Sequence, residues 1–297
     1  MGRVVRNGEG IFNSATRGAV IGQPGRKPAY GQTADKPFFQ FQDVSKAFGS
    51  HVVLDGVSFD VLPGETVCIL GRSGVGKSVC LRLMMGFLKP DSGRVVVHGE
   101  DITDYSEEEL ERIQKKITMV FQNGALFDSL TVAENVAFPL RERGDLDEEQ
   151  INQIVDTLLE MAKVRHLRDL LPAEITTGMK RSVAIARALA AQPEAVLYDE
   201  PTTMVDPVMG RVLGNLIVRL KAQLKLTSVV VTHDMRLSEK LADHIVFLDR
   251  AKIIFRGTVP EMKRSGETLV QQFLRLDKLD LQDLLGLKDA SSKTCRR

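Results

Sequence analysis

The chain has 297 residues, 43% of them hydrophobic and 27% charged, which is long enough to bury a sizeable core in one large domain or two modest ones. Its 40 basic and 39 acidic residues leave a net charge of +1, which excludes the concentrated positive charge that a nucleic-acid partner requires. Three cysteines at unrelated spacings favour a reducing compartment, and no apolar run approaches the roughly 18 residues of a membrane span.

The chain begins with residues 1–37, which are glycine-rich and mildly basic and show neither helical nor strand periodicity. We predict a disordered tail here, because such a segment offers little apolar surface to bury. An arginine-rich start with few acidic residues is also typical of organelle transit peptides, so that alternative stays open.

From Phe38 the sequence has the pattern of antiparallel strands, in FFQFQDVSKAF and VVLDGVSFDVL. The strand TVCIL then ends at Gly71, and Gly76, Lys77 and Ser78 complete the pattern G-x-x-x-x-G-K-S ahead of an amphipathic helix. This pattern is a phosphate-binding P-loop, whose glycines let backbone N–H groups point at phosphate oxygens. Lys77 is placed to reach the β- and γ-phosphates and Ser78 to hold Mg²⁺, so the sequence predicts nucleotide binding.

Beyond the P-loop helix, the strand RVVVHG is followed by a capping box at Ser106 and Glu109 that opens a helix. The strand ITMVFQ then ends at Gln122. Residues 123–190 are dominated by helical periodicity, including a helix capped near Asp147. We predict a helical insertion there.

Strands return in AVLYDE, SVVVTHD and HIVFLD, separated by helices around 209–223 and 236–242, which indicates an α/β core. The run AVLYDEP places two carboxylates at the carboxyl end of a buried strand, where ligands sit in parallel sheets. We expect Asp199 to hold Mg²⁺ and Glu200 to polarise the attacking water of a phosphoryl transfer.

Together these motifs resemble those of ABC ATPases over residues 38–257. The resemblance implies an α/β fold with a P-loop NTPase (RecA-like) core, an antiparallel β subdomain and an inserted α-helical subdomain. It also implies ATP and Mg²⁺ as cofactors. Gln122 matches the Q-loop glutamine, Asp206 the D-loop aspartate and His233 the switch histidine, while Phe48 either stacks on adenine or belongs to the core.

The resemblance implies one set of site residues. Catalytic roles fall to Lys77, Gln122, Glu200 and His233, and Mg²⁺ ligation falls to Ser78, Gln122 and Asp199. Nucleotide contacts fall to Phe48, Gly71, Arg72, Ser73, Gly74, Val75, Gly76, Lys77, Ser78, Val79, Thr176, Gly178 and Asp206.

The family signature Leu-Ser-Gly-Gly-Gln is altered here to Ile175–Met179, ITTGM. Thr176 keeps a hydroxyl and Gly178 a backbone donor, so both phosphate contacts are retained. Thr177 replaces a glycine, and we expect a glycine-type backbone conformation there to cost on the order of 1–2 kcal/mol. Whether the altered signature slows hydrolysis stays open.

A finer resemblance is to the ATPase subunits of MCE-type (Mla/Mkl-like) phospholipid transport systems. It depends on FQNGALFDSLTVAENVAFPLRE at 121–142, the Gly-Met ending of the signature, and VQQFL at 270–274. It implies an ATP-hydrolysing subunit that drives phospholipid transport through a separate membrane permease. The stretch at 121–142 lies where this family meets its permease, so we expect ALF at 125–127 to be partly exposed.

The partners implied are the membrane permease, a second copy of the chain that completes an ATP sandwich, and an MCE-type lipid-binding protein. The implied location is peripheral, at the cytoplasmic face of the inner (plasma) membrane, with an organellar stroma as the alternative. An ABC ATPase for a small polar solute is the second functional hypothesis. A soluble ABC protein of DNA repair or translation is the third, although such proteins require a coiled-coil insertion, a zinc module or a second cassette.

We expect three segments: a tail at 1–37, an ABC ATPase domain at 38–260 with its helical subdomain at about 123–190, and a C-terminal helical extension and tail at 261–297. In the extension, a near-helical spacing is shared by Leu269, Phe273, Leu276 and Leu284. This segment either packs on its own domain or clasps a partner subunit.

Overall fold

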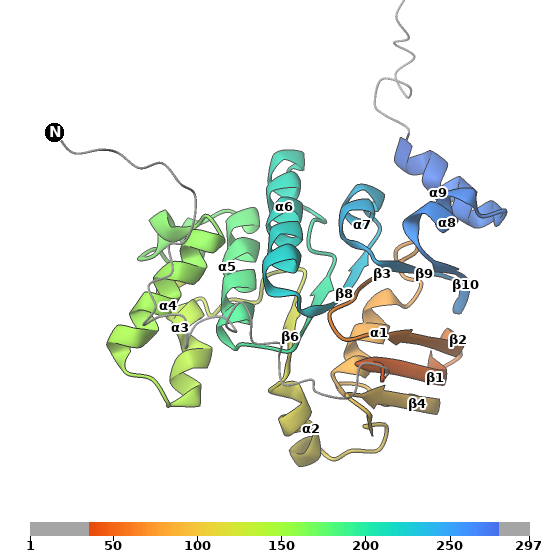
Figure 1. Ribbon diagram of the computed structural model, residues 1–297, viewed down its shortest axis with the longest axis horizontal. Coiled ribbons are helices and arrows are strands. Elements are labelled where there is room, and N and C mark those ends of the chain that lie inside the picture. Colours follow the sequence, from red (N-terminus) through yellow and green to blue (C-terminus); the bar gives the residue numbers. More distant parts are fainter. Residues whose placement is uncertain (1–35, 279–297) are drawn as a thin grey trace, which may run out of the picture.

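The computed structural model describes residues 36–278; residues 1–35 of the tail expected at 1–37, and Leu284, lie outside them. Figure 1 shows the helices α3, α4 and α5 at one end, a large sheet with α6 and α7 in the middle, and a second sheet with β1, β2 and β4 beside it. The predicted α/β fold class, with an antiparallel β subdomain and an inserted helical subdomain, is confirmed.

The smaller sheet is antiparallel, in the order β2-β1-β4-β5. One face of it is apolar because alternate side chains point to the same side of a strand. Phe41 and Phe59 stack across the β1–β2 pair, with ring centroids 4.8 Å apart. Its strands are β1 (Phe39–Phe48), β2 (His51–Val61), β4 (Ser92–Val97) and the short β5 (Glu100–Asp101), the last of which the sequence did not predict.

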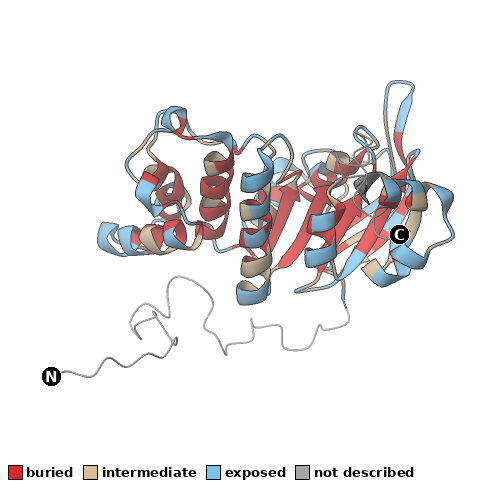
Figure 2. Cartoon of the chain, turned by 90° about the horizontal axis from the view of Figure 1, so that it is seen from above, coloured by how far each residue is buried: buried red, intermediate tan, exposed pale blue. Residues whose placement is uncertain are grey.

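The larger sheet has the order β10-β9-β3-β8-β7-β6, in which β10 alone runs antiparallel to its neighbour. Its central strands are buried on both faces, as Figure 2 shows, and therefore read as continuous apolar runs. The strands are β3 (Thr66–Leu70), β6 (Ile117–Val120), β7 (Ala195–Asp199), β8 (Thr227–Thr232), β9 (His244–Asp249) and β10 (Lys252–Gly257). The sequence did not predict β10. Because β3, β8 and β7 are adjacent and parallel, the loops that leave their carboxyl ends meet at one edge.

The helices begin at clear capping signals. Ser106 forms the predicted capping box of α2, Asp147 caps α4 as predicted and does so with a capping box, and Thr131 forms another at α3. Beside the sheets lie α1 (Lys77–Met84), α2 (Glu107–Gln114), α6 (Pro207–Leu224) and α7 (Met235–Leu241). The helical end contains α3 (Val132–Arg143), α4 (Glu148–Met161), two short 3₁₀ turns (Arg165–Leu167 and Pro172–Glu174) and α5 (Thr177–Ala190).

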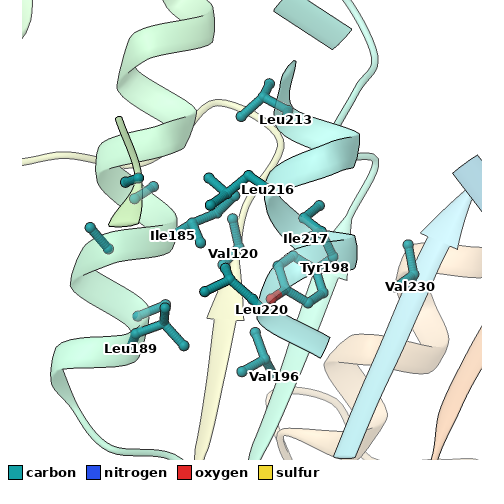
Figure 3. Packing of buried hydrophobic residues seen from close by; sticks show 14 of the residues in the cluster. Val120, Ile185, Leu189, Val196, Tyr198, Leu213, Leu216, Ile217, Leu220 and Val230 are labelled. Atoms are coloured by element: carbon teal, nitrogen blue, oxygen red, sulfur yellow. The ribbon is translucent and has the colours of Figure 1, made fainter. Parts of the chain in front are cut away.

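Helix α6 joins the helical end to the larger sheet. Its apolar face has the spacing i, i+3, i+4, i+7 of an amphipathic helix, and it meets α5 on one side and β7 on the other (Figure 3). The face is formed by Leu213, Leu216, Ile217 and Leu220. Ile185 of α5 and Val196 of β7 belong to the same buried cluster, so the site strands and the helical insertion share one core.

The C-terminal extension packs on its own domain over the part that the structure describes. It comprises α8 (Val259–Arg264) and α9 (Thr268–Lys278). Val270 and Leu274 are buried, and the ring of Phe273 meets that of Phe247 edge to face at 5.0 Å. Within residues 36–278, no helix combines the length and the apolarity that a membrane crossing requires.

We predict that Leu216→Ala lowers the free energy of unfolding by about 2–5 kcal/mol, because it removes a buried side chain and leaves a cavity between α6, α5 and the sheet. Asn215→Ala, at the exposed neighbouring position, should change stability by less than about 0.5 kcal/mol. Urea unfolding followed by circular dichroism measures both. Equal losses in the two variants would contradict this account of the core.

Candidate functional site

The P-loop follows β3 and needs glycine at two positions where backbone and side chains come close. Gly71 has φ 152°, and a Cβ atom there would collide with the carbonyl oxygen of Leu248. Gly76 has φ 104°, and a Cβ atom there would lie 2.6 Å from Cγ1 of Val53. Both positions therefore exclude other residues without movement of the surrounding backbone.

Helix α1 starts at this loop, and Gly76, as its N-cap, supplies no side-chain hydrogen bond to the helix. The first N–H groups of α1 thus face the loop, where they favour an anion. Lys77 is only 5% exposed, and its Nζ donates to the carbonyl oxygens of Gly71 (2.9 Å) and Arg72 (3.0 Å). The loop therefore holds a buried ammonium, whose charge is balanced only in part by neutral carbonyl oxygens.

Two oxygen groups suited to Mg²⁺ lie beside the lysine. The Ser78 hydroxyl donates to Oδ1 of Asp199 at 2.7 Å. Burial raises the pKa of the Asp199 carboxyl, and the Ser78 hydrogen bond acts in the opposite direction. A half-buried carboxylate next to a hydroxyl offers the hard oxygen ligands that a divalent cation prefers.

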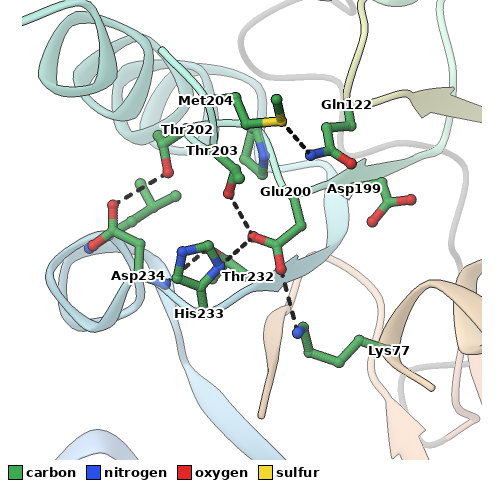
Figure 4. Close-up of polar contacts among 12 residues, drawn as sticks. Lys77, Gln122, Asp199, Glu200, Thr202, Thr203, Met204, Thr232, His233 and Asp234 are labelled. Carbon is green, nitrogen blue, oxygen red and sulfur yellow. Dashed lines mark hydrogen bonds and ion pairs between the residues drawn. The ribbon is translucent and has the colours of Figure 1, made fainter. Parts of the chain in front are cut away.

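Glu200 lies at the centre of the site (Figure 4). Its Oε1 is 3.3 Å from Nζ of Lys77. Its Oε2 accepts a hydrogen bond from the Thr203 hydroxyl at 2.8 Å and lies 2.9 Å from Nδ1 of His233. Because a carboxylate only accepts, Nδ1 of His233 carries the proton in this contact.

These contacts change the acidity of both partners. Burial raises the pKa of Glu200, but the hydrogen bonds from His233 and Thr203 and the charge of Lys77 together outweigh it and bring the pKa to about 2. The hydrogen bond to Glu200 raises the pKa of His233, while burial and the charge of Lys77 lower it and Asp234 adds a small increase. Glu200 is therefore ionised at neutral pH.

The other predicted residues occupy separate positions around this cluster. The Nε2 of Gln122 contacts Sδ of Met204 at 3.6 Å. Asp206 caps α6, and its carboxylate accepts from the N–H groups of Val208 and Met209, both at 3.0 Å. Phe48 ends β1 with its ring 48% exposed, which removes the alternative that it is a core residue.

The altered signature forms the start of α5. Thr176 is the N-cap, and its Oγ accepts from the N–H of Met179 at 3.3 Å, so its own hydroxyl proton remains available to donate. Thr177 is the first helical residue and has no positive φ. The expected backbone cost at Thr177 is therefore wrong, because the first turn of a helix accepts threonine.

Gly178 is buried against α6 of the same chain. A Cβ atom there would lie 3.1 Å from Cβ of Met209 and 2.9 Å from its Cε. The glycine is thus required for close helix packing as well as for its backbone N–H.

Two site residues escaped the sequence analysis. Thr203 touches the Glu200 carboxylate, and Met204 touches the Gln122 amide. A hydroxyl three residues after a carboxylate is a weak local signal for the first contact. The contact between Met204 and Gln122 joins residues 82 positions apart, so no local sequence pattern indicates it.

Comparisons with known proteins place the chain among ATP-binding proteins. It matches the ABC transporter family over residues 54–203. It is 39% identical over 227 residues to the intermembrane phospholipid transport system ATP-binding protein MlaF of Haemophilus influenzae, covering 76% of this chain and 86% of that protein. It is 37% identical over 226 residues to the methionine import ATP-binding protein MetN of Rhizobium johnstonii, covering 76% and 62%.

Among solved structures, the chain is similar to a dimeric ATP-binding cassette in a post-hydrolysis state bound to ADP and Pi. The TM-score is 0.69 at 31% sequence identity, and the match covers 74% of this chain and 98% of that one. The same arrangement of sheets and helices therefore occurs in a protein that holds the products of ATP hydrolysis.

We predict that His233 in the purified chain titrates above the ordinary histidine value of about 6.5, because Glu200 stabilises its charged form. The ion pair between His233 and Glu200 contributes fully to stability at a pH below the ordinary pKa of histidine. This contribution is lost as the pH rises through the raised pKa of His233. Glu200→Gln should lower the pKa of His233, measured by two-dimensional NMR. Glu149→Gln, at an exposed position in α4, should leave it unchanged, and a drop in both variants would argue against the pairing.

Proposed function

We propose that this chain, which belongs to the ABC transporter family, is the ATP-binding and ATP-hydrolysing subunit that drives phospholipid transport through a separate membrane permease. One observation carries the catalytic part of the proposal. Lys77 comes from the start of α1, Asp199 and Glu200 from the end of β7, and His233 from the end of β8, and these three segments meet at the carboxyl edge of one parallel sheet. That edge is the usual ligand site of such sheets.

Each side chain has a distinct task in this proposal. Lys77 exchanges the carbonyl oxygens of Gly71 and Arg72 for phosphate oxygens, helped by the N–H groups at the start of α1. Ser78 and Asp199, together with Gln122, would hold Mg²⁺, which would neutralise phosphate charge when bound.

Glu200 accepts the proton of the attacking water, since it is ionised at neutral pH. His233 and Thr203 hold its carboxylate in place. His233 is half exposed, so it can also reach the γ-phosphate at the mouth of the site.

A second copy of the chain would complete the site. Thr176 and the N–H of Gly178 lie at the start of α5, outside the chain's own cluster, so the phosphate that they bind belongs to a partner's ATP. The solved relative with ADP and Pi is a dimer, which supports this arrangement. Phe48 would stack on the adenine.

The phospholipid assignment draws on how much of each relative the match covers. The phospholipid transport protein of Haemophilus influenzae matches over 86% of its length, whereas the methionine import protein matches over 62% of its own. The small-solute alternative is kept because the two identities, 39% and 37%, are close. An MCE-type lipid-binding protein and a peripheral location at the cytoplasmic face of the inner membrane belong to the same proposal.

The permease would dock at an aromatic patch, defined here as Phe127 and Phe138 with the guanidinium of Arg187. Phe127 is 44% exposed, its ring centroid is 4.8 Å from that of Phe138, and the Arg187 guanidinium lies 5.6 Å from the Phe127 ring. Leu126, by contrast, packs partly against the core, so only part of the expected ALF surface is available.

The aromatic patch is fixed from below by a buried amide. The Oδ1 of Asn135 accepts from the N–H of Phe127 at 2.8 Å, and its Nδ2 donates to the carbonyl oxygens of Phe127, Leu130 and Thr131 at 2.9–3.1 Å. A loop tied in this way presents its aromatic side chains in one geometry. Rigid, partly exposed aromatic rings are typical centres of protein interfaces.

We predict that Lys77→Ala abolishes tight ATP binding because it removes the buried ammonium of the P-loop. Glu200→Gln should keep binding and lose hydrolysis by about 10²–10⁴-fold, the usual contribution of a general base. Binding is measured by fluorescence of a nucleotide analogue and hydrolysis by phosphate release. A similar loss of binding in both variants would show that the two roles are not separate.

The same Glu200→Gln protein also tests the dimer. With saturating ATP and Mg²⁺ it should become a stable dimer by light scattering, and adding Thr176→Arg should prevent this by filling the phosphate position with a bulky cation. Thr177→Gly is the matched control and should leave the dimer intact. A Glu200→Gln protein that stays monomeric with its permease present would rule out the homodimer.

We predict that Phe127→Ser weakens assembly with the permease and leaves ATP binding unchanged. Tagged wild-type and variant proteins are purified from native membranes, and co-purifying subunits and phospholipids are identified by mass spectrometry. Wild type should bring down a permease together with phospholipid, and the variant should lose both. Recovery of a permease without phospholipid would favour the small-solute alternative, and retention by Phe127→Ser would exclude the aromatic patch as the docking site.

A further inference from the structure

A buried arginine joins the signature helix to the catalytic turn. Arg181, in the second turn of α5, is only 3% exposed, and its Nη1 donates to the carbonyl oxygen of Pro201 at 3.0 Å. Its Nε is buried and has no hydrogen-bond partner among residues 36–278. A guanidinium carries five donors and is normally buried against a carboxylate, so a single neutral carbonyl is an unusual partner.

The carbonyl that Arg181 holds belongs to the residue directly after Glu200. Glu200 has φ 46°, a left-handed conformation that costs free energy in a residue other than glycine and persists only where the surroundings enforce it. Within the turn, the N–H of Glu200 donates to the carbonyl oxygen of Val231 at 2.9 Å, and the N–H of Thr203 donates to that of Glu200 at 3.2 Å. Pro201 has no N–H, so its carbonyl is the only backbone group through which this residue can be held.

We propose that Arg181 is a positioning residue for hydrolysis: its hydrogen bond to Pro201 holds the backbone turn that directs the Glu200 carboxylate at Lys77 and His233. Arg181 does not reach the carboxylate itself but acts on the peptide next to it. Since α5 begins at the N-cap Thr176, the same bond joins the catalytic turn to the helix that carries the signature. The expected fall in kcat rests on the proposed role of Glu200 as the base. The expected displacement of the Glu200 carboxylate from His233 does not depend on that role.

A structural role and a positioning role make opposite predictions for stability. A buried cation without a charged partner costs desolvation free energy, and apolar replacements of buried charges are often neutral or stabilising. If Arg181 served the fold alone, its removal would lower stability and activity together. If it positions Glu200, activity falls while stability is kept.

The test compares Arg181→Met with Arg187→Met. Arg187 lies on the same helix and also donates to backbone carbonyls, those of Ala125 (2.8 Å) and Gly124 (3.5 Å), which belong to the loop after β6. The first readout is the pKa of His233 in the purified chain, measured by NMR. Arg181→Met should lower it toward the ordinary value of about 6.5, and Arg187→Met should leave it as in wild type.

The second readout is catalysis by the full chain with its permease. Arg181→Met should lower kcat by about 10- to 100-fold, the effect of a small misplacement of a catalytic group, with ATP affinity and melting temperature retained. Arg181→Lys, which keeps one donor, should recover part of the rate and of the His233 pKa.

An unchanged pKa of His233 in Arg181→Met, or a change shared by Arg187→Met, would overturn the proposal. A parallel loss of kcat and melting temperature would do the same. If Arg181→Met does not fold, Arg181→Lys decides alone. Wild-type stability together with a lowered His233 pKa and a lowered kcat supports positioning. A wild-type His233 pKa together with a wild-type kcat contradicts it. If wild type itself proves unable to hydrolyse ATP, the proposed function fails, and the NMR comparison still tests the position of Glu200.

Discussion

The ionised carboxylate of Glu200 is the group on which the geometry of the site depends. It contacts Lys77 at the start of α1, His233 after β8 and Thr203 in its own turn, so it joins three segments that are remote in sequence. The contacts with Lys77 and His233 exist only because β3, β8 and β7 are adjacent and parallel. A shift of one residue in β7 would turn its carboxyl end toward the opposite face and separate Glu200 from both of them.

The sequence predicts the parts of this site that are local in the chain. Each of these parts spans only a few consecutive residues: the P-loop, the two carboxylates after a strand, and the helix caps at Ser106 and Asp147. The strand and helix patterns around them predict the fold class. Contacts across the chain have no such pattern, which is why the sequence does not predict the contact between Gln122 and Met204. Strand β10 is a different case, because it pairs locally with β9 across a two-residue turn and none of its residues is fully buried. The error at Thr177 has another cause: a glycine in the family signature was taken as a conformational requirement, whereas the position is an ordinary first helical turn.

Helix α5 joins the helical insertion to the carboxyl edge of the larger sheet, where the site lies. Arg187 binds the loop after β6, Arg181 binds the turn after β7, and Gly178 lets α5 approach Met209 at the start of α6. A helix is stiff along its axis, so a shift of α5 moves all three contacts together. The signature lies at the start of α5 and the Arg187 side of the aromatic patch lies further along it, so in the proposed function α5 would connect the permease contact with the site.

The charge of Lys77 is one of the factors that lower the pKa of Glu200, after the hydrogen bonds from His233 and Thr203. With Nζ 3.3 Å from the carboxylate, the lysine adds to a lowering that brings the pKa to about 2, and a carboxylate of that pKa accepts a proton from water poorly. In the proposed function, Lys77 would turn to phosphate oxygens, and sharing its charge with them would weaken the field that it exerts on Glu200. The desolvation of the half-buried carboxylate would then be less completely offset, and the pKa of Glu200 would rise. One ammonium would thus serve both the phosphate site and the proposed base, and the base would gain strength when the phosphate site is filled.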